Sequence, residues 1–300
     1  MNTDPSSFKT LHQPPLPMQQ EPTIDVQLRR IWGASHMPFA KTVRTPFEYP
    51  AFQQLIHRLL QMIQVRSSGV LCGDNGIGKS QLLACALKQL PPKAYKILHL
   101  HHTSLSGNEL LRVLCRQLEQ TPAFRRSDTL RLIANNWVQS DGRFPIVVID
   151  EAQNLSANAL EELRLLSCAQ LDGCTDFVLL LCGDLELMQT LRMRINKPLL
   201  SRLGFQLQMQ PLDPSTLQAY IDHRFKEAGF GSDILEDGAR TLAVQISGGI
   251  LRHTDTLLRA ALQCAALDNQ PTITTQHLQK ALDILPWLAQ RRDMSVLPTP

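Results

Sequence analysis

A short glycine-rich segment limits the possible folds of this chain more than any other feature. Residues 73–80 read Gly-Asp-Asn-Gly-Ile-Gly-Lys-Ser; they follow an apolar run and precede an amphipathic one. Glycines at this spacing let the backbone wrap a phosphate closely, so that its N–H groups and the positive end of the following helix face the anion. The segment therefore predicts a phosphate-binding loop between a strand and a helix. A plain glycine-rich turn is the alternative.

This spacing also predicts individual roles. Lys79 would reach the β- and γ-phosphates, and the Ser80 hydroxyl would bind Mg²⁺, so ATP and Mg²⁺ are the expected cofactors. The predicted nucleotide contacts in this region are Gly73, Asp74, Asn75, Gly76, Ile77, Gly78, Lys79, Ser80 and Gln81.

A second apolar run ends in two acids. Phe144–Ile149 is unbroken and rich in β-branched residues, as is typical of a strand in a parallel sheet with both faces covered. Asp150 would hold Mg²⁺ through water, and Glu151 would polarise the attacking water as a general base. Two carboxylates at a helix start can also serve as caps alone. Together with the loop at 73–80, they predict a protein that binds and hydrolyses ATP.

Strand and helix signals alternate over the first two thirds of the chain. Strands are predicted at 69–72, 95–101, 144–149, 176–182 and 205–209, with helices between them. This alternation predicts an α/β fold of the P-loop NTPase type, in which helices flank a parallel sheet and the phosphate site lies at the carboxyl ends of the strands.

The strand signals stop at Pro211-Leu212-Asp213-Pro214. Beyond this point four helices are predicted, with Ser215 and Thr274 as caps. Residues 1–28 are rich in Pro, Gln and Ser, a composition that indicates a flexible arm. The expected organisation is an arm at 1–28, a nucleotide-binding core at 29–210, a small all-helical lid at 211–285 and a tail at 286–300.

Composition restricts the cellular location. No apolar run approaches the roughly 20 residues of a membrane span, and no signal peptide is visible at the N-terminus. The seven cysteines are scattered without a Cys-x-x-Cys pair, which fits a reducing compartment. We therefore expect a cytoplasmic protein without membrane contact.

The net charge of +3 is unevenly distributed. Eight basic residues and three acids lie between positions 88 and 131, whereas nine acids and two arginines lie between positions 141 and 186. The basic block predicts either a nucleic-acid surface or one of two complementary subunit faces; solvated helix faces are the plain alternative. The candidate DNA contacts are Lys93, Lys96, Arg112, Arg116, Arg125 and Arg126.

These motifs resemble those of the AAA+ ATPases. Within them, Trp32-Gly33 with Pro38-Phe39, the stretch Asp150-Glu151-Ala152-Gln153-Asn154-Leu155, and Tyr220-Ile221-Asp222-His223-Arg224 resemble the ExeA-type subgroup over residues 30–285. That subgroup includes secretion ATPases and ATPases encoded beside transposases, such as phage Mu B protein and the Tn-family C proteins.

The resemblance implies three further site residues. Asp184 occupies the sensor-1 position, where the family usually has a neutral polar residue, so a carboxylate here departs from the pattern. Arg202 matches the arginine finger, which would reach the γ-phosphate of a neighbouring subunit. Arg252 matches the sensor-2 arginine, which contacts the phosphate in cis. A complete site would then exist only in a homo-oligomer, either a ring or a helical filament.

Two functions follow from the resemblance. The first is a DNA-binding regulator of transposition that assembles on duplex DNA with ATP and recruits or activates a transposase, with a target-selection protein as a further partner. The alternative is an ATPase that assists secretion or envelope assembly. A nucleotide-switched scaffold with little hydrolysis is also kept open by Asp184.

Overall fold

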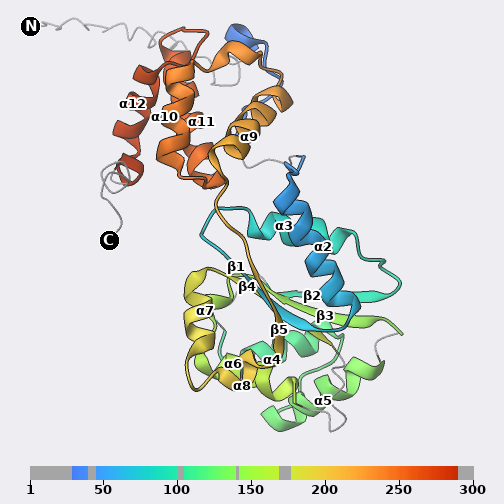
Figure 1. Cartoon of the computed structure of the whole chain (residues 1–300). Coiled ribbons are helices and arrows are strands. Elements are labelled where there is room, and N and C mark those ends of the chain that lie inside the picture. The colour runs from blue at the N-terminus through green and yellow to red at the C-terminus, as the bar shows by residue number, and fades with distance from the viewer. Residues whose placement is uncertain (1–28, 40–44, 101–104, 140–141, 169–176, 290–300) are drawn as a thin grey trace, which may run out of the picture.

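The computed structural model describes residues 29–39, 45–100, 105–139, 142–168 and 177–289 (Figure 1). The expected arm at 1–28 lies outside these residues. In the described part, five strands form one parallel sheet in the order β2-β3-β4-β1-β5. The strands are β1 (Ser68–Cys72), β2 (Tyr95–Leu100), β3 (Phe144–Ile149), β4 (Val178–Gly183) and β5 (Leu203–Gln208). The predicted α/β fold is confirmed.

Helices cover both faces of this sheet, and the strand side chains alternate between two cores. Val147 and Ile149 of β3 face the core under one helical layer, whereas Ile146 and Val148 face the other. All four are fully buried, which explains why the run is unbroken in apolar character. One layer is α2 (Pro50–Gln64) and α3 (Lys79–Lys88); the other contains α4 (Gly107–Gln117), α5 (Arg126–Gln139), α6 (Ala157–Leu166), α7 (Leu185–Arg192) and α8 (Lys197–Leu200).

The apolar spacing of residues 47–65 predicts a helix over that range, but α2 begins only at Pro50. Pro50 occupies its first turn, where the missing N–H costs nothing. Tyr49 is extended (φ −131°, ψ 162°), as is usual for a residue before proline. The proline therefore determines where α2 starts.

A second unit, made of helices, follows the sheet (Figure 1). It contains α9 (Pro214–Glu227), α10 (Asp237–Ser247), α11 (Leu251–Leu267) and α12 (Thr275–Ile284), with a short 3₁₀ turn at Ser232–Ile234. A second 3₁₀ turn, Ala152–Asn154, follows β3 in the sheet domain. Asp213, rather than Ser215, caps α9: its carboxylate accepts the N–H groups of Ser215 and Thr216. Thr274 does occupy the N-cap of α12, as predicted.

The helical unit holds more of the chain than expected. Ala34 and Phe39 lie in its hydrophobic core, and the Phe39 ring meets Phe225 edge to face at 5.0 Å. Trp32 Nε1 donates to the Pro271 carbonyl at 2.6 Å. The segment around residues 32–39, expected in the nucleotide-binding core, thus packs on the helical unit: Phe39 is buried against Phe225 of α9, and Trp32 lies against Phe230.

The end of the described chain also packs here. Leu288 is fully buried in the same core, although it belongs to the expected tail. Within the described ranges, no helix combines the length and the apolar character that a membrane span requires.

Candidate nucleotide-binding site

The loop at 73–80 joins the end of β1 to the start of α3, as predicted. Gly78 is the N-cap of α3 and has a left-handed backbone (φ +105°), as does Gly76 (φ +86°). Ile77, 2% exposed, anchors the loop in the core beneath it. The first turn of α3 thus presents its N–H groups where the loop curves, which is the arrangement that binds phosphate.

Two glycines leave space that a side chain would fill. A Cβ on Gly73 would lie 2.5 Å from the carbonyl oxygen of Met209, and a Cβ on Gly76 would lie 2.5 Å from Arg252 Cβ. At such distances the backbone or the neighbour would have to move. The cradle therefore depends on glycine at both positions, as a phosphate loop requires.

Lys79 lies inside this loop. Its side chain is buried, and Nζ donates to the carbonyl oxygens of Gly73 at 2.9 Å and Asp74 at 3.0 Å. Both acceptors are neutral carbonyls, so the positive charge of the ammonium group stays available to a phosphate anion.

Ser80 and Asp150 meet although 70 residues separate them. Ser80 Oγ donates to Asp150 Oδ2 at 2.8 Å. Ser80 lies in the first turn of α3, after β1, and Asp150 directly follows β3; β1 and β3 lie on either side of β4. A hydroxyl and a carboxylate are the oxygen ligands that Mg²⁺ prefers, so this pair and the glycine cradle fit a magnesium–nucleotide complex. They would hold the cation, which would neutralise charge on the transferred phosphate.

The end of β4 lies directly beneath this pair. Burial, and then the nearby Asp150 carboxylate, raises the pKa of the Cys182 thiol well above its usual range. The thiol is therefore neutral, and it does not add negative charge next to the magnesium ligands.

Glu151 is held by a residue that sequence reasoning did not identify. Gln153 Nε2 donates to Glu151 Oε2 at 2.7 Å, and Gln153 Oε1 accepts the backbone N–H of Asp184 at 3.3 Å. Glu151 itself has a left-handed backbone (φ +53°). A Cβ on Gly183 would lie 2.6 Å from Gln153 Oε1, so the glycine at the end of β4 makes room for this amide.

Asp184 has a structural task in this arrangement. Its Oδ1 accepts the N–H groups of Glu186 at 2.9 Å and Leu187 at 3.3 Å, which caps α7. The carboxylate thus lies at the positive end of a helix, where a negative charge is stabilised. This location explains how an acid is accommodated at a position where a neutral residue is usual.

Arg252 reaches the loop from the helical unit. Its backbone N–H donates to the Gly76 carbonyl at 3.0 Å, and its side chain lies along the same glycine. The first turn of α11 therefore contacts the phosphate loop directly, and this contact supports a role of Arg252 in the same subunit.

Arg202 lies where the strands begin, at the end of the sheet opposite to the phosphate loop. It immediately precedes β5, whose first residue Leu203 pairs with Ser68 at the start of β1, whereas the phosphate loop follows Cys72 at the end of β1. The guanidinium is exposed and donates to the Pro198 carbonyl of α8. Within one subunit Arg202 is therefore remote from the phosphate loop.

The six candidate DNA contacts are distributed over the β2 edge and the helices beside it. Lys96 on β2 pairs with Glu119 at 3.3 Å, and Arg126 pairs with Glu162 at 2.5 Å. Lys93, Arg116 and Arg125 are exposed. Arg112 is partly buried on α4. Four of the six are thus exposed, and among the described residues only Arg126 of these four has an ion pair.

A cleft of about 450 Å³ opens beside the loop, where β5 leaves the sheet for the helical unit. Met209 links the two, since its N–H donates to the Cys72 carbonyl at 2.8 Å. The other lining residues come from the start of α2 and from the connection, namely Tyr49, Pro50, Ala51, Gln54, Leu55, Arg58, Gln208, Gln210, Pro211, Leu212, Asp213 and Thr216. Burial raises the pKa of Tyr49 to about 12, so its hydroxyl is neutral.

The stretch 220–224 serves the helical unit. Tyr220 donates its hydroxyl hydrogen to Asp255 Oδ1 at 2.6 Å, and Arg224 binds both Glu227 Oε2 (2.7 Å) and the Thr45 carbonyl (3.2 Å). The bond from Arg224 fastens Thr45 to α9, and the bond from Tyr220 joins α9 to α11. Phe39 and Ile221 are both buried in the core of this unit.

Comparisons with known proteins agree with this geometry. Residues 61–191 match the family model described as an AAA domain. The chain is similar to General secretion pathway protein A of Aeromonas hydrophila, with 31% identity over 204 residues, or 65% of this chain. It spans 36% of the length of that relative. This similarity confirms the predicted likeness to the ExeA-type subgroup.

Solved structures show the same architecture at low identity. Cdc6p from Pyrobaculum aerophilum superposes with a TM-score of 0.66 at 16% identity, covering 82% of this chain and 69% of that one. Drosophila ORC bound to DNA gives a TM-score of 0.62 at 17% identity, covering 93% and 70%. The chain therefore shares the P-loop AAA+ fold of these structures, and residues 61–191 match the model of an AAA domain.

Proposed function

We propose that this protein is a magnesium-dependent ATPase whose site is completed by a neighbouring copy of the chain. The observation that carries the proposal is the meeting of Ser80 and Asp150 at 2.8 Å beside the buried Lys79. Lys79, Ser80 and Asp150 bind the phosphates and the cation, and Glu151 takes the proton of the attacking water. The cleft suits the base of the nucleotide, because Tyr49, Leu55 and Met209 give it an apolar part and Met209 lies beside Gly73 of the loop.

Assembly is supported by the surface around Arg202. Arg194 and Lys197, which precede Arg202 by a few residues, are also exposed, and the neighbouring Met193 and Ile195 are 56% and 71% exposed. By contrast, acids gather at the carboxyl ends of the strands, among them Asp150, Glu151, Asp184 and Glu186. The surface near the amino ends of the strands is thus cationic and partly apolar, and the surface at their carboxyl ends is anionic. Opposite charges at the two ends of one sheet favour a head-to-tail contact between copies. Such contacts form rings or helical filaments.

We propose duplex DNA as the polymer on which these copies assemble, with a transposase and a target-selection protein as partners, as the motif resemblance implies. The exposed Lys93, Arg116 and Arg125 would contact phosphates without reading the sequence. Release of phosphate after hydrolysis would loosen the contact between subunits.

The experiment measures ATP hydrolysis and DNA binding against protein concentration. Wild type is expected to hydrolyse ATP more than proportionally as concentration rises, and faster still with long duplex DNA. Glu151→Gln should bind ATP normally but lose roughly 100-fold or more in turnover. Equal phosphate release from both proteins would refute the role of Glu151. Turnover per subunit that is independent of concentration would refute the shared site.

A second candidate function is assistance to secretion, and the similarity to General secretion pathway protein A favours it. The two candidates differ in their response to DNA. An ATPase that assembles and turns over equally with and without duplex DNA, at several salt concentrations, would favour secretion.

A further inference from the structure

A phenylalanine stands exposed at the tip of the loop between α4 and α5. The Phe124 side chain is 100% exposed, although phenylalanine is among the residues most often buried. Pro122 and Ala123 precede it, and Arg125 and Arg126 follow it. Among the described residues the ring takes no part in a hydrophobic core, so it is open to contact with a partner molecule.

The loop beneath the ring is held in place. Thr129 is 1% exposed, and its hydroxyl donates to the carbonyls of Ala123 at 3.2 Å and Arg125 at 3.3 Å. At the other end, the Gln120 N–H donates to the Cys115 carbonyl at 3.0 Å. The tip is therefore a fixed projection, which lowers the entropy cost of placing the ring in a partner.

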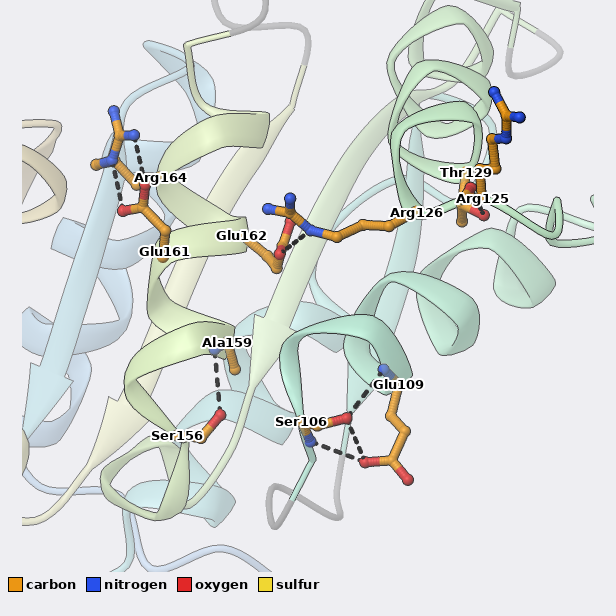
Figure 2. Close-up of polar contacts among 10 residues, drawn as sticks. All are labelled: Ser106, Glu109, Arg125, Arg126, Thr129, Ser156, Ala159, Glu161, Glu162 and Arg164. Carbon is orange, nitrogen blue, oxygen red and sulfur yellow. Dashed lines mark hydrogen bonds and ion pairs between the residues drawn. The ribbon is translucent and has the colours of Figure 1, made fainter.

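The two arginines that follow the ring have different roles. Arg126 extends to α6, where its Nε donates to Glu162 Oε1 at 2.5 Å (Figure 2). The Glu162 side chain is only 5% exposed, so this pair anchors the start of α5. Arg125 is exposed and extends away from Glu162 (Figure 2). One arginine thus secures the tip, and the other is presented beside Phe124.

The charge around the tip favours an anionic partner. On α4, which packs against α5, Arg112 and Arg116 lie one turn apart. The acids near these arginines have other partners. Glu109 on α4 accepts a hydrogen bond from Ser106 Oγ at 2.7 Å, and Glu119, just after α4, pairs with Lys96 at 3.3 Å. On α5, Asp128 and Arg131 are both exposed, and their opposite charges add up to zero.

We propose that this tip is a wedge for duplex DNA. Phe124 would enter a base step from the minor groove and partly unstack it, while Arg125 and Arg116 bind the flanking phosphates. Apolar wedges of this kind kink the duplex, and they prefer pyrimidine–purine steps, which unstack most easily. The proposal rests on the proposed binding of DNA and adds a preference for deformable sites to it. A membrane is a poorer partner, because one ring buries too little area for stable attachment.

The test uses the full chain with ATP and a short duplex that carries a fluorophore at each end. Wild type should bring the duplex ends closer, as energy transfer reports, most strongly with a central TA step. Phe124→Ala should lose this change and bind roughly tenfold more weakly, with the same dependence on salt. Arg125→Glu should reduce the slope of log affinity against log salt by about one. Ile284→Ala is the control, since Ile284 is 67% exposed on α12 of the helical unit.

The outcomes separate this proposal from the one it rests on. Phe124→Ala is expected to melt at the temperature of wild type, because the ring has no contacts to lose. If Phe124→Ala bends and binds DNA as wild type does, the wedge is refuted while DNA binding stands. If wild type itself fails to bind duplex DNA, both are refuted. Binding of wild type, but not Phe124→Ala, to phosphatidylglycerol vesicles in place of DNA would assign the tip to a membrane.

Discussion

Gln153 fixes the proposed general base to the neighbouring strand. Its amide nitrogen donates to Glu151 Oε2 at 2.7 Å, and its amide oxygen accepts the Asp184 N–H at 3.3 Å. A carboxylate on a left-handed residue is thereby held in one orientation, between the ends of β3 and β4. Gln153 thus acts through Glu151 as a positioning residue.

Replacement of this amide should affect turnover and not binding. In Gln153→Ala the Glu151 carboxylate loses its fixed orientation, so kcat is expected to fall roughly tenfold, a part of what a general base contributes. KM should change little, because Gln153 has no contact with the phosphate loop among those described. Steady-state ATPase assays would measure both, with Gln189→Ala on the exposed side of α7 as the control. A raised KM with normal kcat would contradict the positioning role.

Arg202 is expected to act in the site of another copy. Arg202→Ala and Lys79→Ala should each lose most activity alone, since one lacks the finger and the other the phosphate-binding lysine. Mixed in equal amounts they should recover a measurable part of wild-type turnover, because a Lys79→Ala copy can supply Arg202 to an intact loop. Mixtures no more active than the separate proteins, although assembly is seen by light scattering, would place Arg202 outside the site.

Glycine 76 should be irreplaceable for a reason of space as well as backbone conformation. Gly76→Ala would place a Cβ 2.5 Å from Arg252 Cβ. The strain, about 1–3 kcal/mol, corresponds to a loss of ATP affinity of roughly 5- to 150-fold. Gly248→Ala is the matched control: it also has a positive φ (+58°), but nothing lies within 4 Å of its Cβ position. Isothermal titration with ATP should separate the two variants, and equal affinities would refute the steric argument.

The helical unit should lose stability in acid through Glu227. Burial would raise its pKa, but the hydrogen bonds from Thr45 and Arg224 outweigh burial and lower the pKa to about 2 from the usual 4.5. A lowered pKa in the folded state means that this stabilisation is complete above pH 4.5 and is lost as the pH falls to about 2. Glu227→Gln should therefore unfold more easily by about 1–2 kcal/mol at neutral pH.

The difference between wild type and Glu227→Gln should shrink as the pH is lowered and disappear near pH 2. Urea unfolding at a series of pH values would measure it. Glu236→Gln, which changes an exposed glutamate of the same unit, should show no comparable trend. A constant difference at all pH values would mean that the charge of Glu227 is not the cause.

Local patterns were sufficient for the sheet and for the ends of its strands. The run Phe144–Ile149 is apolar at every position because both faces of β3 are covered, and the structure buries it as predicted. The chain continues directly from strand to loop to helix at residues 68–88, so the location of Lys79 and Ser80 follows from neighbours in sequence. The start of α2 is an exception, since apolar spacing predicts it at residue 47 and the helix begins at Pro50.

Contacts between distant elements were not accessible from such patterns. The contacts of Gln153 with Glu151 and with the Asp184 N–H depend on how the ends of β3 and β4 pack, and the capping contacts of Asp184 depend on where α7 begins. The aromatic residues at 32–39 precede the sheet in sequence, but their partners Phe225 and Phe230 lie in and just beyond α9.

The sequence by itself determined the phosphate loop, the acids after β3, the parallel sheet and the helices that follow, because each depends on spacing and periodicity within a short stretch. Only the tertiary structure decided that Ser80 meets Asp150, that Gln153 holds Glu151, that Arg202 lies far from its own loop and that Phe124 is exposed. The physical reason is that side-chain distances across strands and helices depend on how those elements pack, which no local pattern specifies.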